Sequence, residues 1–176
     1  IPSLAMLAEG IGDPQVRNRG TIGGSIANND PAADYPSACL ALNATIHTNK
    51  RKIVAEKFFK GMFETELKKG ELIETVEFEL PEKASYAKFP NPASRYAVVG
   101  VYVAKLNKEV RVAVTGAASS VFRSKELESA LSTNFSSSSI DNINISSDGF
   151  NEDIHASAEY RAHMTKVMAK KAILAC

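Results

Sequence analysis

Cysteine and histidine are scarce in this chain, which has two cysteines and three histidines in 176 residues. Cys39 and Cys176 lie too far apart in the sequence to indicate a metal knuckle or a disulfide framework. His155 and His163 have no partner ligand at the spacing of one helical turn, which argues against a zinc site. Cys39 lies among alanines and leucines and is interpreted as a buried, small apolar residue. The sequence therefore predicts neither a metal site nor a disulfide.

Long apolar runs and a strong charge imbalance are also missing. No run approaches the roughly 18 consecutive apolar residues that indicate a membrane-spanning helix, and no secretory signal is present. The formal net charge is +1, and aromatic residues do not alternate with basic ones, which argues against a nucleic-acid partner. We therefore expect no transmembrane segment and no binding to nucleic acid.

Hydrolytic machinery is absent as well. None of the serines lies in a Gly-x-Ser-x-Gly elbow, and the sequence ties no histidine to a serine as a catalytic triad requires. We predict no catalytic residues of this kind. With 44% hydrophobic and 23% charged residues, the chain is typical of a globular protein with one core or two small ones.

The most informative segment runs from Val16 to Pro36 and contains the pair Gly23-Gly24. Glycine has no β-carbon, so a ligand can approach the backbone and the N–H groups can turn toward an anion. Arg17 and Arg19 precede the pair, and Asp34 follows it as an acceptor for sugar-alcohol hydroxyls. The same residues also fit a plain turn that enters a strand, with Asp34 near the start of a short helix. The spacing matches neither the Gly-Lys-Ser/Thr phosphate loop nor the three-glycine dinucleotide motif, so both interpretations stay open.

The run from Ile11 to Pro36 closely resembles the FAD-binding subunit of the molybdenum hydroxylases. It is most like the medium subunit of aerobic carbon monoxide dehydrogenases and is similar to the flavin domain of xanthine dehydrogenase. The resemblance extends along nearly the whole chain. Besides the Thr-Ile-Gly-Gly-Ser core it is carried by Gly70–Ile73, Tyr86–Phe89 and Asp153–Arg161.

The resemblance implies a set of cofactor-binding residues. The second FAD-binding loop would comprise Thr21, Ile22, Gly23, Gly24 and Ser25. Asp34 would bind the polar chain of the cofactor, and Ile11 would line the same cleft. Ile73 would pack against the flavin ring, and Lys88 would reach the ring from a second domain. Ordinary core packing is an equal alternative for Ile11 and Ile73, and a surface ion pair is an alternative for Lys88.

The resemblance also implies a larger complex. A molybdenum–pterin centre in a large subunit would oxidise a small substrate, and two [2Fe–2S] clusters in a small subunit would pass the electrons to FAD in this chain. The flavin would deliver them to a quinone, a cytochrome or NAD, while the protein supplies orientation and electrostatics. We expect a dimer of heterotrimers in the cytoplasm, with association at the inner face of the membrane as an alternative.

One part of the family pattern is absent. Family members carry, upstream of the region present here, a first lobe with another glycine-rich loop of the form Ala-Gly-Gly-x-Ser-Leu, and no segment of this chain resembles it. We therefore expect a C-terminal fragment of a longer polypeptide, inactive by itself and with weak or no FAD binding, because half of the cleft is missing.

The expected fold is α+β, in two pieces. Residues 1–80 would form the second lobe of a PCMH-type FAD-binding domain, 81–85 a linker, and 86–176 a C-terminal domain with a three-stranded antiparallel sheet and a helical bundle. Periodicity and turn signals predict the following elements. Helices are expected near 2–9, 36–42, 126–131 and 157–175, strands near 44–49, 76–80, 96–106 and 110–114, and an exposed serine-rich loop over 132–149.

Two surface features receive no site. The basic cluster Lys50-Arg51-Lys52 is interpreted as a solvated hairpin tip. Many relatives carry two basic residues after the positions of Lys88 and Phe89, whereas this chain has Pro90-Asn91-Pro92, a stiff turn that puts a charge-based partner contact there in doubt. Two other functions stay open, a stand-alone flavoprotein oxidoreductase of the same fold and a scaffold that has lost its flavin.

Overall fold

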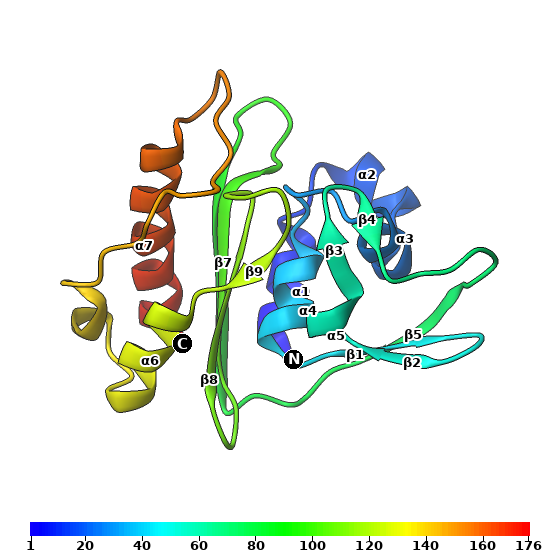
Figure 1. The fold of residues 1–176 in the computed structure, drawn as a ribbon, viewed down its shortest axis with the longest axis horizontal. Helices are drawn as coiled ribbons and strands as arrows, with labels where there is room; N and C mark the ends of the chain where they lie inside the picture. The colour runs from blue at the N-terminus through cyan, green and yellow to red at the C-terminus, as the bar shows by residue number, and fades with distance from the viewer.

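The computed structural model describes all residues from 1 to 176 and has the α+β organisation that the sequence predicts. A central antiparallel sheet separates two sets of elements (Figure 1). The long C-terminal helix covers one face of this sheet, and two of the short N-terminal helices cover the other. A second, smaller sheet lies beyond those helices, at the far end of the molecule.

Four short helices open the chain. Helix α1 (Pro2–Glu9) begins with proline and ends at Gly10, as the proline-first and glycine-last preference predicts. Helix α2 (Pro14–Arg19) follows, capped by the Asp13 carboxylate, which accepts from the Val16 N–H at 2.9 Å. Helix α3 (Ile22–Asn28) and helix α4 (Tyr35–Ala41) complete the group. The Gly23-Gly24 pair lies within α3.

The smaller sheet has the order β2-β1-β5, formed by β1 (Thr45–Thr48), β2 (Lys52–Val54) and β5 (Ile73–Glu77). Between β2 and β5 lie α5 (Ala55–Phe58), β3 (Phe59–Gly61) and β4 (Glu64–Thr65), with β3 paired to β4. The sequence predicted the strand that corresponds to β5 at 76–80, which is wrong in its position because β5 begins and ends three residues earlier. The short β1 ends its pairing at Thr45 opposite Glu77, so the chain beyond Glu77 has no strand to pair with.

The central sheet has the order β6-β7-β8-β9. Its strands are β6 (Lys83–Pro90), β7 (Ala97–Lys105), β8 (Val110–Thr115) and the two-residue β9 (Phe122–Arg123). The three long strands agree with the predicted three-stranded sheet, and β9 adds a short fourth strand that the sequence did not indicate. Strand β6 begins at Lys83, so it takes up part of the predicted linker at 81–85.

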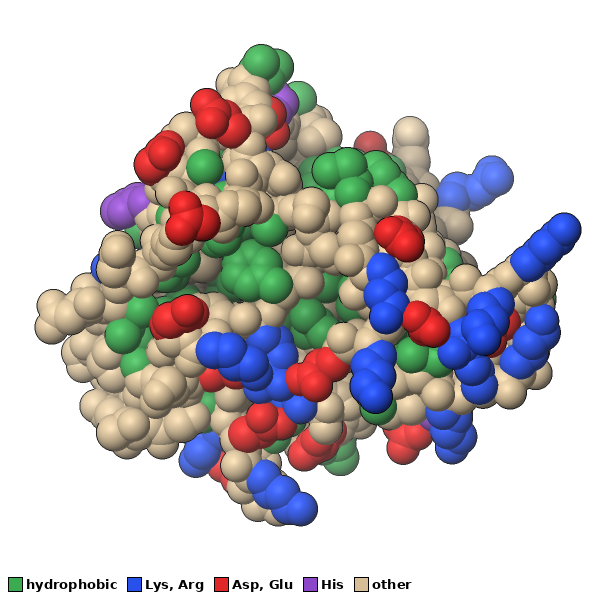
Figure 2. All heavy atoms as spheres, in the orientation of Figure 1, with side chains coloured by type: hydrophobic (Ala, Val, Ile, Leu, Met, Phe, Trp, Pro, Cys, Tyr) green, Lys and Arg blue, Asp and Glu red, His purple; other side chains and the backbone are tan.

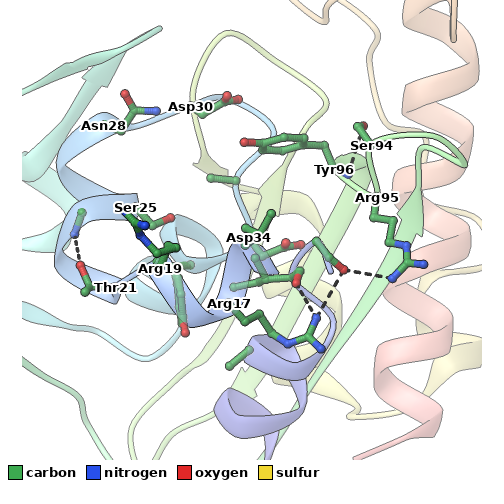
Figure 3. Close-up of a pocket in the computed structure, with 18 of the residues that line it drawn as sticks. Arg17, Arg19, Thr21, Ser25, Asn28, Asp30, Asp34, Ser94, Arg95 and Tyr96 are labelled. Atoms are coloured by element: carbon green, nitrogen blue, oxygen red, sulfur yellow. Dashed lines mark hydrogen bonds between the residues drawn. The ribbon is translucent and has the colours of Figure 1, made fainter. Parts of the chain in front are cut away.

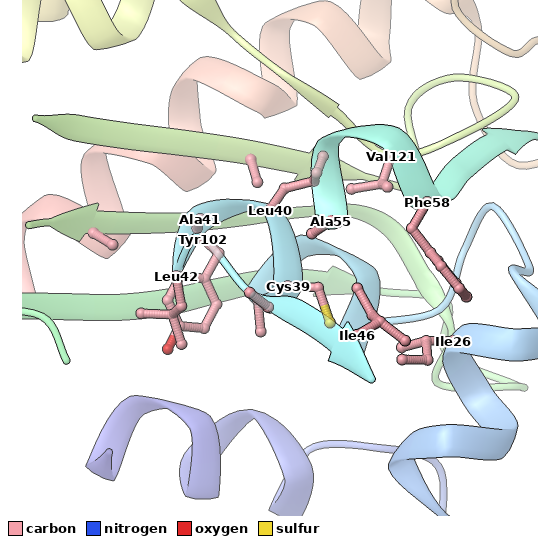
Figure 4. Packing of buried hydrophobic residues seen from close by; sticks show 14 of the residues in the cluster. Ile26, Cys39, Leu40, Ala41, Leu42, Ile46, Ala55, Phe58, Tyr102 and Val121 are labelled. Carbon is pink, nitrogen blue, oxygen red and sulfur yellow. The ribbon is translucent and has the colours of Figure 1, made fainter. Parts of the chain in front are cut away.

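Alternate residues of β7 face two different hydrophobic clusters. Tyr102 and Ala104 belong to a cluster that includes Leu42, at the end of α4, and Ile46, on β1. Figure 4 shows Tyr102 with Leu42 and Ile46 in this cluster. Val101 and Val103 face the opposite side, with α6 (Lys125–Thr133) and α7 (Ala158–Leu174). All residues of β7 except Lys105 are buried, as expected for a strand that is covered on both faces. The domain boundary at 81–85 stays a prediction.

The serine-rich stretch is mostly exposed, as predicted, but it is anchored. A 3-10 helix (Ser137–Ile140) turns the side chain of Ile140 into the cluster beneath α6 and α7, where it is fully buried. Helix α7 is capped by Ser157, one residue before its first turn. The helical spacing of Tyr160, Met164, Val167 and Met168 predicts one buried face, and the structure buries Met164 and Met168 but leaves Tyr160 43% exposed. Cys39 is fully buried, also as predicted.

The basic cluster at the β1–β2 turn is not simply solvated. Figure 2 shows lysine and arginine side chains gathered at this end of the molecule. Arg51 pairs with Glu71 at 2.8 Å and with Glu66 at 3.4 Å, and so ties the hairpin tip to the turn before β5. The expectation of a purely solvated cluster is therefore wrong for Arg51. No helix in the structure combines the length and apolar character that a membrane span requires.

Candidate functional site

A cavity with a volume of about 610 Å³ lies among the N-terminal helices. Helices α1 to α4 and the turns between them provide most of its walls (Figure 3). The turn from Ser94 to Tyr96, between β6 and β7, closes one side. The cavity therefore joins residues that are more than 80 positions apart in the sequence, such as Ile11 and Arg95.

The structure brings together five of the nine residues predicted to bind a cofactor. The cavity is lined by Ile11, Thr21, Gly24, Ser25 and Asp34. Four others, Ile22, Gly23, Ile73 and Lys88, do not line it. Ile73 packs at the edge of the N-terminal hydrophobic cluster, beside Gly23. Lys88 lies behind Asp34, and its ammonium group contacts the carboxylate.

The Gly-Gly pair forms the first turn of helix α3, and not the loop or turn that the sequence indicated. Thr21 caps this helix, because its hydroxyl accepts from the Gly24 N–H at 2.9 Å. This cap offsets the low helix propensity of two glycines. Neither glycine has a positive φ. A Cβ at Gly24 would lie 3.1 Å from the Thr21 hydroxyl, so a larger side chain there would press on the cap and narrow the cavity wall.

Asp34 is the most buried carboxylate of the cavity, with 4% of its surface exposed. The Tyr86 hydroxyl donates to its Oδ1, and the Lys88 ammonium donates to its Oδ2 at 3.1 Å. Burial raises the pKa of Asp34, while Lys88 and Tyr86 act in the opposite direction. Burial and the neighbouring Asp34 raise the pKa of Tyr86 well above its usual value, so the phenol keeps its proton and donates.

Lys88 forms an ion pair, as the alternative interpretation proposed, but the pair is buried and not on the surface. Its side chain is 11% exposed, and its ammonium group also donates to the Gly10 carbonyl at 2.7 Å. Lys88 therefore connects the end of α1 to the start of α4. The sequence could not indicate this pairing, because 54 positions separate Lys88 from Asp34.

Three arginines line the cavity, and two of them donate to backbone carbonyls in the turn between α1 and α2. Arg17 donates to the carbonyl of Ile11 at 2.9 Å, and Arg17 and Arg95 both donate to the carbonyl of Gly12 (Figure 3). Arg19 makes no side-chain hydrogen bond or ion pair with the protein. Each guanidinium carries five N–H donors, so all three keep donors that the protein does not use.

Sequence reasoning missed the contribution of the turn from Ser94 to Tyr96. Arg95 has a positive φ of 61°, a backbone conformation that residues other than glycine adopt rarely and that is found in turns and at functional sites. The prolines around Asn91 were the only signal of a shaped turn. They could not show that the turn folds back onto the cavity of the N-terminal helices.

The chain is similar to several known proteins. The family model described as "FAD binding domain in molybdopterin dehydrogenase" matches residues 1–82. The glyceraldehyde dehydrogenase medium chain of Sulfolobus acidocaldarius is 40% identical over 73% of this chain and 50% of its own length. The carbon monoxide dehydrogenase medium chain of Hydrogenophaga pseudoflava is 31% identical over 98% of this chain and 66% of its own length.

Solved structures show the same fold. A carbon monoxide dehydrogenase of Hydrogenophaga pseudoflava that lacks the Mo-pyranopterin moiety superposes with a TM-score of 0.84 at 30% identity, over 99% of this chain and 67% of that one. The enzyme of Oligotropha carboxidovorans gives a TM-score of 0.88 at 24% identity, over 99% of this chain and 66% of that one, and supports the fold alone. These matches confirm the predicted fold class.

The chain spans half to about two thirds of the length of the curated relatives that it matches first, from 50% to 66%. Several of these relatives are named as medium chains or medium subunits of dehydrogenases and hydroxylases. Together with the family model and the solved structures, they confirm the family that the sequence resembles. The chain belongs to the FAD-binding medium subunits of the molybdenum hydroxylases, the family that includes the medium chains of carbon monoxide dehydrogenases.

Proposed function

We propose that the protein containing this chain is the FAD-carrying electron-transfer subunit of a molybdenum hydroxylase. The single observation that carries the proposal is the cavity of about 610 Å³, which brings Thr21, Gly24, Ser25 and Asp34 together with unpaired arginine donors. Family membership supplies the identity of the cofactor. The cavity would receive part of the FAD, and the remaining contacts would come from outside the residues present here.

The donors of the cavity suit an anionic, hydroxyl-rich ligand. Guanidinium groups bind phosphate oxygens through charge-assisted hydrogen bonds, and Arg19 has no competing partner in the protein. Arg17 and Arg95 each use one terminal nitrogen on the Gly12 carbonyl and keep other N–H groups free. The arginines would therefore contact the diphosphate of FAD.

Asp34 suits the sugar-alcohol chain of the cofactor. Each carboxylate oxygen accepts one protein donor, from Tyr86 or from Lys88, and an ionised carboxylate offers about four acceptor positions in all. Acceptor capacity therefore remains for hydroxyl groups in the cavity. We assign Thr21 and Ser25 to further polar contacts, Gly24 to the close approach of the cofactor, and Ile11 to the apolar part of the wall.

The redox chemistry would come from the bound FAD, and this chain would hold, orient and shield it. We propose a molybdenum–pterin large subunit and a small subunit with two [2Fe–2S] clusters as partners, in a dimer of heterotrimers. We also propose the division into 1–80, a linker at 81–85 and 86–176. Residues 1–176 alone should be inactive and should bind FAD weakly or not at all.

Elemental and flavin analysis of the full-length protein, purified with its natural partners, tests this function. Flavin, iron and molybdenum in the same fractions would support the proposal. Flavin without metals would favour a stand-alone flavoprotein, and the absence of all three would favour a scaffold.

The variant Gly24→Val tests the site itself. Its side chain would displace the Thr21 cap and fill part of the cavity wall, so FAD content should fall to near zero. Gly149→Val is a matched control, because a Cβ at Gly149 has no neighbour within 4 Å, although its positive φ adds local strain. Full FAD content in Gly24→Val would show that FAD does not bind in this cavity.

A further inference from the structure

We infer that Tyr86 is a positioning residue which, in a space left open by Gly100, fixes the carboxylate of Asp34 toward the cofactor cavity. The inference rests on the proposed function, because it assigns Asp34 to the polar chain of FAD. It adds two residues, Tyr86 and Gly100, that the cavity does not contain. Both belong to the central sheet and reach the cavity only through Asp34.

The first observation is the contact itself. Tyr86, on β6, donates its hydroxyl hydrogen to Oδ1 of Asp34, which lies 52 positions earlier in the chain. The ring of Tyr86 stacks on the ring of Tyr102, with the two centroids 6.0 Å apart and the planes inclined by 30°. Tyr102 is fully buried, so the phenol ring has a rigid neighbour and little freedom to turn away.

The second observation is independent and concerns Gly100 on β7. A Cβ placed on Gly100 would collide with the hydroxyl of Tyr86 and would lie 2.9 Å from Cγ2 of Thr115. Gly100 does not have a positive φ, so its backbone conformation does not require glycine. The missing side chain makes room for the Tyr86 phenol exactly where it meets Asp34. Glycine in a strand interior often marks such a close approach.

The third observation concerns the backbone that carries Asp34. The hydroxyl of Thr115, on β8, lies 2.7 Å from the carbonyl oxygen of Ala33 and 3.0 Å from that of Pro31, so its one hydrogen is shared between them. The Gly116 N–H donates to the same Pro31 carbonyl at 2.8 Å. Strand β8 and the residue that follows it therefore hold the main chain just before Asp34, while β6 holds its side chain.

These contacts give each carboxylate oxygen a separate donor. Tyr86 holds Oδ1, and Lys88 holds Oδ2 while it also donates to the carbonyl of Gly10. Two donors on two oxygens fix the rotation of the carboxylate plane, which a single ion pair would leave free. A ligand that needs this acceptor then meets it already oriented, and pre-orientation lowers the entropy cost of binding.

The test compares Tyr86→Phe with Tyr102→Phe in the full-length protein. Both variants remove one hydroxyl and keep the stacked rings, but the Tyr102 hydroxyl pairs with Ser3 at 2.7 Å and does not contact Asp34. We expect the dissociation constant for FAD to rise about 10-fold or more in Tyr86→Phe, since hydrogen bonds to charged groups contribute about 1.5–3 kcal/mol. Tyr102→Phe should change it less than about 3-fold.

A double-mutant cycle with Asp34→Asn separates positioning from general stability. If Tyr86 acts through Asp34, adding Tyr86→Phe to Asp34→Asn should cause no further loss of FAD affinity. Independent, multiplying losses would overturn the inference and leave the proposed function intact. Unchanged FAD affinity in Asp34→Asn itself would overturn both the inference and the role of Asp34, and a wild-type protein without FAD would overturn the proposed function.

Gly100→Ala provides a second route to the same result. Its methyl group should push the Tyr86 phenol away from Asp34, so its FAD dissociation constant should rise as in Tyr86→Phe, with no additional rise when the two changes are combined. Wild-type affinity in a folded Gly100→Ala protein would show that the open space at Gly100 does not serve Tyr86. If Gly100→Ala fails to fold, the Tyr86 cycle alone decides.

Discussion

The buried pair of Lys88 and Asp34 allows a pH-dependent prediction for Lys88→Met. Methionine keeps most of the volume of lysine but removes the charge that faces Asp34. The side chains are 11% and 4% exposed, so water replaces the lost charge only in part, from the cavity side of Asp34. Removing one member of a buried ion pair costs about 3–5 kcal/mol, because the remaining charge stays uncompensated. Since whole proteins are stable by about 5–15 kcal/mol, this loss is large.

The size of the loss should depend on pH in a definite direction. Burial already raises the pKa of Asp34 above 3.8 in the folded protein, and loss of Lys88 removes the charge that opposes this rise. The folded state then binds the proton more tightly than the unfolded state. Stability therefore falls as the pH rises from about 3.8 through the raised pKa. Well below pH 3.8 Asp34 is neutral in both states, and the loss should shrink toward about 1 kcal/mol for the Lys88 contact with Gly10.

Urea unfolding of the wild-type and Lys88→Met apoproteins between pH 3.5 and 8 measures how this loss of unfolding free energy depends on pH. Lys83→Met is the matched control, since Lys83 lies on the same strand, is exposed and forms no ion pair. The double variant Asp34→Asn/Lys88→Met removes both charges and should recover most of the stability lost at neutral pH. The reasoning fails if Lys88→Met loses the same free energy at every pH, or if the double variant is no more stable than Lys88→Met.

Three further predictions concern other parts of the chain. The Arg51 contacts and the Lys68 N–H lower the pKa of Glu71 from 4.5 to about 2. These contacts therefore stabilise the fold above pH 4.5, and their contribution is lost as the pH falls toward 2. Glu71→Gln should remove this part of the acid dependence when the free energy of unfolding is measured against pH. Burial raises the pKa of the Cys39 thiol to about 12, so a thiol reagent at pH 8 should leave Cys39 unmodified until denaturant is added, and labelling of native Cys39 would contradict its burial. Ile140→Ala should destabilise the protein by about 2–5 kcal/mol, as expected for a fully buried isoleucine, whereas Ser132→Ala in the same serine-rich stretch should change the unfolding midpoint very little.

Local patterns predicted several of the longer helices and strands. Pro2 and Gly10 mark the ends of α1, and the spacing of Met164 and Met168 identified the buried face of α7. The alternating valines of β7 and β8 indicated a buried hairpin. These signals work because capping, periodicity and burial act over a few neighbouring residues.

The site was predicted less completely. Its composition followed from family resemblance, which named Asp34 and Lys88 but placed Lys88 against the flavin ring. The ion pair between them depends on how β6 lies beside α4, and no local pattern encodes that distance. Arg95 was missed for the same reason, because its positive φ and its contact with Gly12 arise only in the folded chain.

The Gly-Gly pair shows a different limit. Two adjacent glycines disfavour a helix, so the sequence favoured a loop or a turn. The Thr21 side chain satisfies the Gly24 N–H and allows the helix to begin there. The cap was visible in the sequence as a threonine three residues before Gly24, but its meaning depended on the helix that it starts.

The alternation along β7 makes the length of this strand critical. Odd and even positions serve different layers, with Val101 and Val103 on one side and Tyr102 and Ala104 on the other. Deleting or inserting one residue would turn the Tyr102 ring into the valine layer and the valines toward α4, because a shift of one residue exchanges the faces of a strand. The turn that follows β7, at Asn107–Glu109, lines no part of the cavity and could vary in length with little harm. The strand itself can neither gain nor lose a residue without disrupting both layers together.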